Sequence, residues 1–505
     1  MLKIPKIKQT CEDTFVCLGK TEYADYARDT DEVVYKAKND NFDVTLNGNP
    51  CEVRECRVSA MPFNRPWPGK QRPYDQTESA GFISFSADET VEVSVKSQKA
   101  FEKAIIRPLS KNVSPHIEKD EVVFTLQEPG NYVLELDDTH NVLHIFFNPV
   151  KTYENAEKAT RYFGPGMHFP GVIYLNDNDT VYIDEEAIVF GSINTLGAKN
   201  VKIFGGGIID NSCEERIVEN AYENFTKGTF RIYNCENIDV SDIILTNSCT
   251  WSMSMFNCKN INIDNVKIVG QWRYNTDGID VVNSENVTIK NCFIRSFDDT
   301  ISIKAIYNYP KPIQNITAEN CVMWCGWGKN CEIGIETSGI EYKNITFKNC
   351  DLIHNAGAAL CISNGCYADM HDILFENMRV ELQSDTMSPV LQCEDKQKYA
   401  PETKYTLPHL VLNSNATFGI RQKSTEGPKR KVTDIVGKIH DVHYKNIQVF
   451  TDDDNVKPGI VTESRDPDTP LKNFTFENIS INGTQVTDFN RFNTSFTNAQ
   501  NIIIK

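Results

Sequence analysis

The chain has 505 residues, of which 40% are hydrophobic and 24% are charged, and its formal net charge is −17. This length is sufficient for two or more domains with a large buried core. The acidic balance argues against nucleic acid or an anionic membrane surface as a partner, because both bind basic surfaces.

The sequence has no apolar run near the roughly 20 residues that span a bilayer, so no membrane partner is expected. The first residues also lack the apolar segment of a secretory signal. The sequence therefore predicts a cytoplasmic protein, or a secreted one if a signal has been removed.

Residues 1–150 are predicted to form a β-sandwich-like domain. Short runs that alternate apolar and polar side chains recur about every ten residues, and most end at a turn signal. The expected strands are Val91–Lys96, Val122–Leu126, Tyr132–Leu136 and Val142–Phe147. Catalytic residue types do not gather here, so we expect this domain to support the remainder of the chain or to flank a substrate.

Residues 151–505 are predicted to form a second domain built on a repeat. Its unit has the form of Asn286-Val-Thr-Ile-Lys-Asn-Cys292, with a short β-branched run between two asparagines. Repeats of this length with one strand signal each indicate a solenoid, here a parallel β-helix whose alternate side chains point inward. The second asparagine of the unit recurs as Asn265, Asn291, Asn320, Asn349, Asn377, Asn446 and Asn478.

The asparagine suits a bend between two strands, because its side chain tolerates the left-handed backbone conformation. Stacked asparagines are expected to hydrogen-bond to one another from coil to coil. The next residue is always apolar or cysteine, so Cys292, Cys321 and Cys350 are predicted to be buried side chains and not disulfide partners. No set of cysteines has the spacing of a zinc site, and neither a metal nor a cofactor is expected.

The repeat is interrupted between about residues 383 and 436. The asparagines on either side lie 69 residues apart, and the intervening segment includes the charged stretch Lys423–Lys431. Such a loop either borders the binding site or is a solvated excursion, and the sequence leaves both open.

Two acidic clusters, Asp277/Asp280 and Asp298/Asp299, lie about one repeat apart. On adjacent coils they would be separated by about 4.8 Å, the spacing of paired strands. Carboxylates that close cannot all ionise, so one stays protonated as an acid while another acts as a base. Glycoside hydrolysis needs such a pair. The alternative is that Asp277 and Asp280 only cap a turn in Asn275-Thr-Asp-Gly278.

The stretch Asn275-Thr-Asp277, followed by Asp298-Asp299 and Ile301-Ser-Ile-Lys304, resembles the active-site signature of glycoside hydrolase family 28, the polygalacturonase-like enzymes. The likeness extends from Gly164-Pro-Gly166 to about residue 380. The N-terminal β-domain and the three aspartates also resemble glycoside hydrolase family 49, which includes dextranase and isopullulanase.

This resemblance implies a right-handed parallel β-helix of the pectin-lyase-like kind and hydrolysis with inversion. It further implies that Asp298 is the general acid and that Asp277 and Asp299 hold and activate the water. Adjacent strand residues point to opposite faces, so Asp298 and Asp299 share a cleft only if the backbone departs from regular pairing there.

The chain departs from the family pattern at two places. Gly326-Trp-Gly328 stands where polygalacturonases carry Gly-His-Gly, and Cys361-Ile-Ser363 stands where they carry an Arg-Ile-Lys that grips the uronate carboxylate. A similar triplet, Arg421-Gln-Lys423, comes about two coils too late. A hydrolase is therefore predicted, whereas polygalacturonate as its substrate does not follow.

Several residues around the aspartates are candidates for binding a sugar. Trp272, Trp324 and Trp327 either stack on pyranose rings or are buried in a core. Lys304, with Arg273 as a weaker candidate, is expected to bind a hydroxyl or an acid group. Glu332 and Glu336 alternate with apolar residues and so face outward, where they bind hydroxyls or are solvated. The full set predicted to bind substrate is Asn275, Asp280, Lys304, Trp272, Arg273, Trp327, Glu332 and Glu336.

The sequence thus predicts an inverting glycoside hydrolase whose partner is a plant or microbial oligo- or polysaccharide. Two alternatives stay open: a polysaccharide lyase on the same β-helix, and a non-catalytic glycan-binding solenoid. The sugar, the linkage, the endo or exo mode and the oligomeric state do not follow from these residues.

Overall fold

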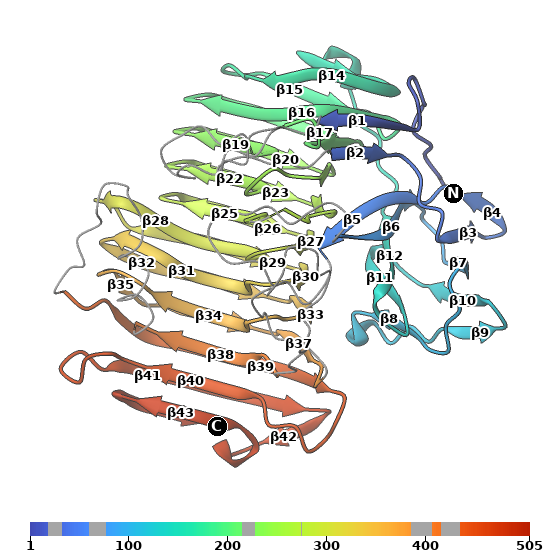
Figure 1. Cartoon of the computed structure of the whole chain (residues 1–505). Helices are drawn as coiled ribbons and strands as arrows, with labels where there is room; N and C mark the ends of the chain where they lie inside the picture. Colours follow the sequence, from blue (N-terminus) through green and yellow to red (C-terminus); the bar gives the residue numbers. More distant parts are fainter. Residues whose placement is uncertain (19–32, 60–76, 215–227, 274, 385–406, 416–434) are drawn as a thin grey trace.

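The computed structural model describes residues 1–18, 33–59, 77–214, 228–273, 275–384, 407–415 and 435–505. Regular structure in this part is almost entirely β (Figure 1). No helix in the described ranges is long and apolar enough to cross a membrane. Most of the predicted interruption, including Lys423–Lys431 and the Arg421-Gln-Lys423 triplet, lies outside the described residues. The 3₁₀ helices in these described ranges are η2 (Leu109–Lys111), η3 (Ala156–Lys158) and η5 (Phe489–Arg491).

The N-terminal part contains two five-stranded sheets, in the orders β4-β3-β7-β10-β9 and β5-β6-β12-β11-β8. Their facing side chains form one core, with Val93 and Phe124 from the first sheet and Leu134 and Ile145 from the second. All four strands predicted here are present. The strands are β1 (Thr14–Leu18), β2 (Val33–Lys36), β3 (Phe42–Leu46), β4 (Asn49–Cys51), β5 (Arg54–Ser59), β6 (Thr77–Ser86), β7 (Val91–Ser97), β8 (Ala104–Arg107), β9 (His116–Glu118), β10 (Glu121–Leu126), β11 (Gly130–Leu136) and β12 (Asp138–Asn148).

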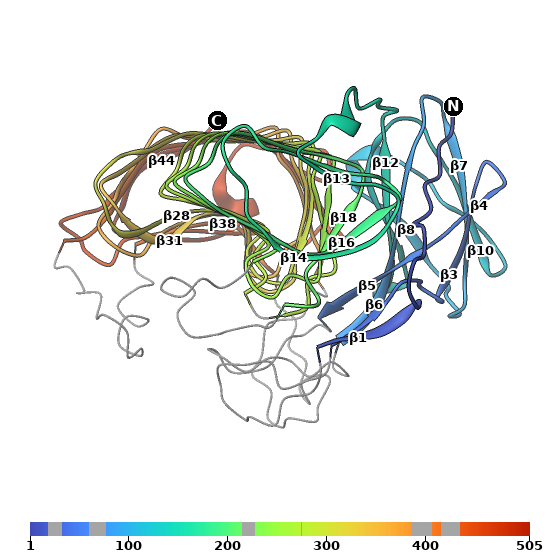
Figure 2. The ribbon, with the colours of Figure 1, turned by 90° about the horizontal axis from the view of Figure 1, so that it is seen from above.

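The remaining strands form one 32-stranded sheet that winds into a parallel β-helix, so the predicted fold class is confirmed. Residue 150, the predicted domain boundary, falls between β12 and β13. The view along the coils shows three stacks of strands around a core, with the N-terminal domain beside one of them (Figure 2).

One of the three stacks lies on the side of the β-helix that carries the predicted aspartates, and we call it the site stack. It contains β14 (Gly166–Ile173), β16 (Ala187–Leu196), β19 (Phe230–Tyr233), β22 (Met253–Phe256), β25 (Ile279–Val282), β28 (Ile301–Tyr309), β31 (Lys329–Gly339), β34 (Ala358–Asn364), β38 (His409–Ser414), β40 (Gly459–Glu463) and β43 (Asn493–Thr497).

The asparagine stack follows next along each coil. It contains β13 (Arg161–Phe163), β15 (Thr180–Ile183), β17 (Lys199–Gly205), β20 (Glu236–Ser241), β23 (Lys259–Asp264), β26 (Glu285–Lys290), β29 (Ile313–Glu319), β32 (Glu341–Lys348), β35 (Asp369–Met370), β36 (Ile373–Glu376), β39 (Lys438–Thr451), β41 (Leu471–Ile481) and β44 (Ala499–Ile504), with β42 (Thr484–Val486) antiparallel to β41.

The interface stack completes each coil and faces the N-terminal domain. It contains β18 (Ile208–Asp210), β21 (Ile244–Thr246), β24 (Lys267–Ile268), β27 (Phe293–Ser296), β30 (Val322–Cys325), β33 (Asp351–His354) and β37 (Arg379–Leu382).

The repeat asparagines behave as predicted. All seven have a positive φ between 53° and 57°. Side chains bond from coil to coil, for example Asn446 Nδ2 to Asn377 Oδ1 at 2.8 Å and Asn478 Nδ2 to Asn446 Oδ1 at 2.7 Å. The inward prediction is also confirmed, because the cysteines at positions 292, 321 and 350 are fully buried free thiols of the β-helix core.

A second apolar core joins the N-terminal domain to the interface stack. It unites Phe82 and Phe146 of the domain with Phe293, Trp324 and Ile353 of the β-helix. This contact explains why the strands of the interface stack are largely buried on both faces: one face lines the β-helix core and the other is covered by the domain.

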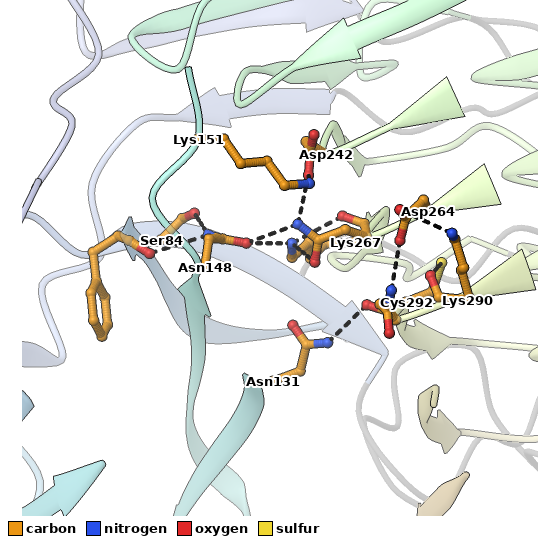
Figure 3. Close-up of polar contacts among 12 residues, drawn as sticks. Ser84, Asn131, Asn148, Lys151, Asp242, Asp264, Lys267, Lys290 and Cys292 are labelled. Carbon is orange, nitrogen blue, oxygen red and sulfur yellow. Dashed lines mark hydrogen bonds and ion pairs between the residues drawn. The ribbon is translucent and has the colours of Figure 1, made fainter. Parts of the chain in front are cut away.

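Polar side chains form a seam beside this second core (Figure 3). Lys267 is buried, and its Nζ donates to Asn148 Oδ1 at 2.6 Å, Asn265 Oδ1 at 2.7 Å and the Asn265 carbonyl at 2.9 Å. The Asp242 carboxylate, whose charge also acts on Lys267, accepts from Lys151 Nζ at 2.6 Å and from Asn265 Nδ2 at 2.8 Å. Within the described ranges, the hydrogen bonds of Lys267 Nζ thus all go to neutral oxygens.

Stability should depend on pH through Lys267. Burial lowers its pKa to about 7, below the value of about 10.4 for a lysine in an unfolded chain. Between these values the unfolded chain binds one more proton, so this group makes the free energy of unfolding rise with pH, by up to about 1.4 kcal/mol per unit. That gain is lost again as the pH falls toward 7.

Urea unfolding at pH 7, 8 and 9 tests this expectation. Lys267→Met should show a shallower increase with pH than the wild type. Lys290→Met, at a partly exposed lysine of β26, should keep the wild-type slope. Equal slopes in the wild type and Lys267→Met would contradict the assignment.

Candidate active site

The predicted aspartates lie on the outward side of the site stack, around β25, β28 and β31. Ile279, Ile301 and Cys331 are paired in register and point into the core. Their neighbours along each strand therefore point outward. These outward neighbours form a row across three coils: Asp280, Ser302 and Glu332.

The sequence predicts Asp277 and Asp298 at corresponding positions of neighbouring coils, and the observed pairing differs from this prediction by one residue. Gly278 N donates to the Asp299 carbonyl at 2.8 Å, and Ile279 N donates to the Thr300 carbonyl at 2.8 Å. Asp277 is therefore level with Asp299 and not with Asp298. Repeat spacing did not reveal this, because coils vary in length at their bends.

Asp298 and Asp299 lie in a bend between β27 and β28, outside any strand. The backbone departure that the two adjacent aspartates require is therefore present. Asp298 is half-buried, whereas Asp299 is only 6% exposed and accepts a hydrogen bond from Lys329 N at 2.9 Å.

Gly328 makes room for both carboxyl groups. A Cβ on this residue would lie 2.4 Å from Asp299 Oδ1, 2.5 Å from Asp298 Oδ1 and 2.6 Å from Asp299 N. The two Oδ1 atoms thus converge on one point, and a residue with a side chain would displace them.

Gly328→Ala is expected to lower kcat/KM about 100-fold, because misplacement of reacting groups by about 1 Å has effects of that order. Gly326→Ala is the matched variant in the same loop, since its added Cβ has a nearest contact of 3.2 Å. It should lose much less activity. Measurement of kcat/KM and of the melting temperature for both variants tests this expectation. Equal losses of kcat/KM in Gly328→Ala and Gly326→Ala would contradict the role given to Gly328.

Asp277 is almost fully buried and is held by Lys304. Lys304 Nζ lies 2.8 Å from Asp277 Oδ2 and 2.8 Å from Asp280 Oδ1, and Ser302 Oγ donates to Asp280 Oδ1 at 2.6 Å. Burial raises the pKa of Asp277 well above its usual range, against the opposing Lys304 ammonium, and the other aspartates raise it further. Burial raises the pKa of Asp280 in the same way.

Two predicted binding residues lie at the surface of the site. Asn275 has a left-handed backbone, and its Nδ2 donates to Asp298 Oδ2 at 3.4 Å. Trp327 is half-buried and stacks on Phe297, with ring centroids 5.8 Å apart and an interplanar angle of 11°. Because Phe297 immediately precedes Asp298, Trp327 offers an aromatic surface close to Asp298.

The predictions for Trp272 and Arg273 must be corrected, and the open alternative for Trp324 is decided, because all three side chains are buried. Trp272 is 1% exposed, its Nε1 bonds to Asn247, and its carbonyl accepts from Ser59 of the N-terminal domain. Arg273 has no exposed surface and donates to the Glu214 carbonyl. Trp324 belongs to the second apolar core. In this arrangement none of the three contacts a ligand.

Lys304 and Asp280 are likewise too buried, at 3% and 0% exposure, to contact a sugar as predicted. Instead, Lys304 Nζ contacts the carboxyl groups of both Asp277 and Asp280. Glu332 and Glu336 lie on the outward side of β31, but Glu332 is not exposed, and Lys329 Nζ lies 3.5 Å from its Oε1. Glu336 is half-buried.

The sequence interpretation missed three residues of the site. Lys329 directly follows Gly328. Burial opposes its charge, but the carboxylates of Glu332, Asp299 and Asp298 raise the pKa of Lys329 above its ordinary value. The Trp251 ring lies 4.1 Å from Lys304 Nζ, and Arg231 is in register, through Ser254, with Asp280. Aligning the coils on their inward residues, in addition to their asparagines, would have found Arg231.

Among the described residues, no group of three or more histidine, cysteine, aspartate or glutamate side chains could hold a metal ion. The fold and the site together define a parallel β-helix with a buried cluster of carboxylates on one outward face.

Comparison with known proteins agrees with this description. The family model for glycosyl hydrolases family 28 matches residues 169–398, which contain the whole carboxylate cluster. The chain is 28% identical over 147 residues to a probable rhamnogalacturonase B of Aspergillus oryzae, covering 29% of this chain and 26% of that protein. It is 24% identical over 365 residues to an isopullulanase of Aspergillus niger, covering 60% and 62%.

Solved structures share the fold. Dex49A from Penicillium minioluteum superimposes with a TM-score of 0.59 at 12% identity, over 91% of this chain and 93% of that one. A hyperthermoactive exopolygalacturonase from Thermotoga maritima gives 0.50 at 15% identity, over 70% and 86%. The chain spans about a quarter of the length of the rhamnogalacturonases it matches. The resemblance to family 28, with a family 49-like architecture, is confirmed.

Proposed function

We propose that the chain is a glycoside hydrolase that cleaves an O-glycosidic bond of an oligo- or polysaccharide with inversion. The observation that carries this proposal is the meeting of Asp277, Asp298 and Asp299 at one bend of the site stack. Two of these carboxyl groups are buried and one is half-exposed, so the three lie in different environments, as the separate roles of an acid and a base in glycoside hydrolysis require.

Asp298 is the general acid in this proposal, because its half-exposed carboxyl group is open to the glycosidic oxygen of a bound sugar. Asp277 and Asp299 hold the water in this proposal, and burial raises the pKa of Asp277, which suits it to accept the proton of the water. Trp327 provides a stacking surface for a pyranose ring next to the acid.

The substrate class follows from the relatives and from charge. Matched proteins named rhamnogalacturonases support a pectin-like polysaccharide. The position of the missing basic triplet is filled by Cys361, which pairs with Glu332, and the ammonium group of the neighbouring Lys329 already lies 3.5 Å from the Glu332 carboxyl group. A uronate carboxylate beside β31 would compete with Glu332 for this lysine, and we therefore propose that the sugar bound there is neutral.

A panel of galacturonides, neutral galactosides, glucans and rhamnose-containing fragments tests the proposal. We expect hydrolysis of a fragment with a neutral sugar at the cleavage point, and NMR of the first-formed anomer should show inversion. A product with a new double bond that absorbs in the ultraviolet would establish a lyase instead. Binding without turnover, unaffected by loss of the three aspartates, would establish a glycan-binding solenoid.

A further inference from the structure

Lys304 does not lie where a substrate-binding lysine would lie. It is on β28, level with Val282 of the preceding coil, and its ammonium group reaches back to β25 beneath the acidic cluster. There it contacts Asp277 and Asp280 at 2.8 Å each, and it lies over the Trp251 ring at 4.1 Å. Its side chain is 4% exposed, so the ammonium is committed to these partners.

The groups that face this ammonium are almost all acidic. They are Asp277 just before β25, Asp280 on β25, Asp299 from the bend and Glu336 from β31. Asp277 itself faces Lys304, Asp280, Asp298 and Asp299. Lys304 thus contacts both buried carboxylates, Asp277 and Asp280, with one ammonium group. Without it, Asp277 and Asp280 would be two buried acids side by side, which cannot both ionise at moderate cost.

Because of this contact, the two carboxyl oxygens of Asp277 have different surroundings. Oδ2 is held by Lys304, whereas Oδ1 accepts no hydrogen bond from any described residue. A buried carboxylate oxygen without a donor is costly unless a ligand or water supplies one. Oδ1 is therefore the atom at which a water molecule would donate its hydrogen bond and lose its proton.

We propose that Lys304 is a positioning residue that keeps Asp277 ionised and directs its Oδ1 toward the attacking water. This inference rests on the proposed hydrolase function. In the reaction, the water oxygen bonds to the anomeric carbon and its proton passes to Asp277 Oδ1. The glycosidic bond breaks as Asp298 gives its proton to the leaving oxygen. The Lys304 ammonium keeps its protons throughout.

Two substitutions should shift the pH–rate profile in opposite directions. Lys304→Met removes the charge that lowers the pKa of Asp277, so the acidic limb of kcat/KM should move up by at least one pH unit. At pH values below that limb, kcat/KM should then fall by about tenfold for each unit of the shift. Asp280→Asn removes a carboxylate that raises this pKa and leaves Lys304 wholly to Asp277. The acidic limb of that variant should therefore move to lower pH.

Lys304→Arg should restore part of the wild-type profile, since it keeps the charge, and Lys259→Met, at a half-exposed lysine of β23, should leave it unchanged. A merely structural role would lower the rate equally at all pH values. That result for Lys304→Met, or an acidic limb that stays in place or moves up in Asp280→Asn, would overturn the inference. If Lys304→Met does not fold, Asp280→Asn and Lys304→Arg still decide.

Failure of the inference can be told apart from failure of the proposed function. If the wild type cleaves a saccharide and Asp298→Asn does not, the function holds, and the two pH profiles then judge Lys304 alone. If the wild type cleaves no member of the panel, the proposed function fails and the inference fails with it.

Discussion

Asp298→Asn is expected to lower kcat about 10²- to 10⁴-fold, which is the contribution of a general acid. Asparagine cannot donate a proton to the leaving oxygen, although it has the same shape. The melting temperature should change little, because Asp298 is half-exposed and lies in a bend outside the strands, where its side chain accepts hydrogen bonds from Asp299 N at 3.1 Å and Asn275 Nδ2 at 3.4 Å. Single-turnover rates and thermal unfolding measure the two effects.

Asp239→Asn is the matched control for this substitution. Asp239 lies on β20 of the asparagine stack and is exposed, so the change removes one surface charge and should leave the rate unchanged. Turnover at the wild-type level in Asp298→Asn would exclude the residue as the acid.

Arg107→Met should lower the free energy of unfolding by about 3–5 kcal/mol, since it leaves buried charges without their cation. Arg107 joins the domains: its Nε lies 2.8 Å from Glu135 Oε2, and its Nη1 contacts Glu381 of β37. His354 of β33 also contacts Glu135. Although burial opposes it, His354 and Arg107 hold the pKa of Glu135 at about 2, whereas burial raises the pKa of Glu381 to about 7.

Denaturant unfolding followed by fluorescence and circular dichroism tests this expectation. Adding Glu381→Gln to Arg107→Met should recover part of the loss, because one uncompensated carboxylate is then removed. Lys111→Met breaks a solvent-exposed pair with Glu128 and should cost less than about 1 kcal/mol. A loss below that value for Arg107→Met would show that the buried network does not hold the domains together.

The fold was predictable because its signals are local. A left-handed asparagine, a β-branched run and a small inward residue recur in each repeat, and each favours its conformation wherever the coil lies. The three aspartates could be recognised for the same reason, since each of the two short stretches that contain them, Asn275-Thr-Asp277 and Asp298-Asp299, is continuous in sequence.

The positions of the other site residues were not predictable, because burial depends on what packs over a face. Trp324 is a residue type that often stacks on sugar rings, but the N-terminal domain covers the face of the β-helix on which it lies. Asp277 is level with Asp299 because the length of one bend fixes the register.

The sequence by itself therefore determined the β-helix, the N-terminal sandwich and the identity of the acidic cluster, through periodicity and backbone preference. Only the tertiary structure decided that Lys304 holds Asp277 and that Gly328 leaves room for both remaining carboxyl groups. The physical reason is that charge pairing and close packing depend on the distances between side chains on neighbouring coils. These side chains are about one repeat apart in sequence, so no local pattern shows how close they come.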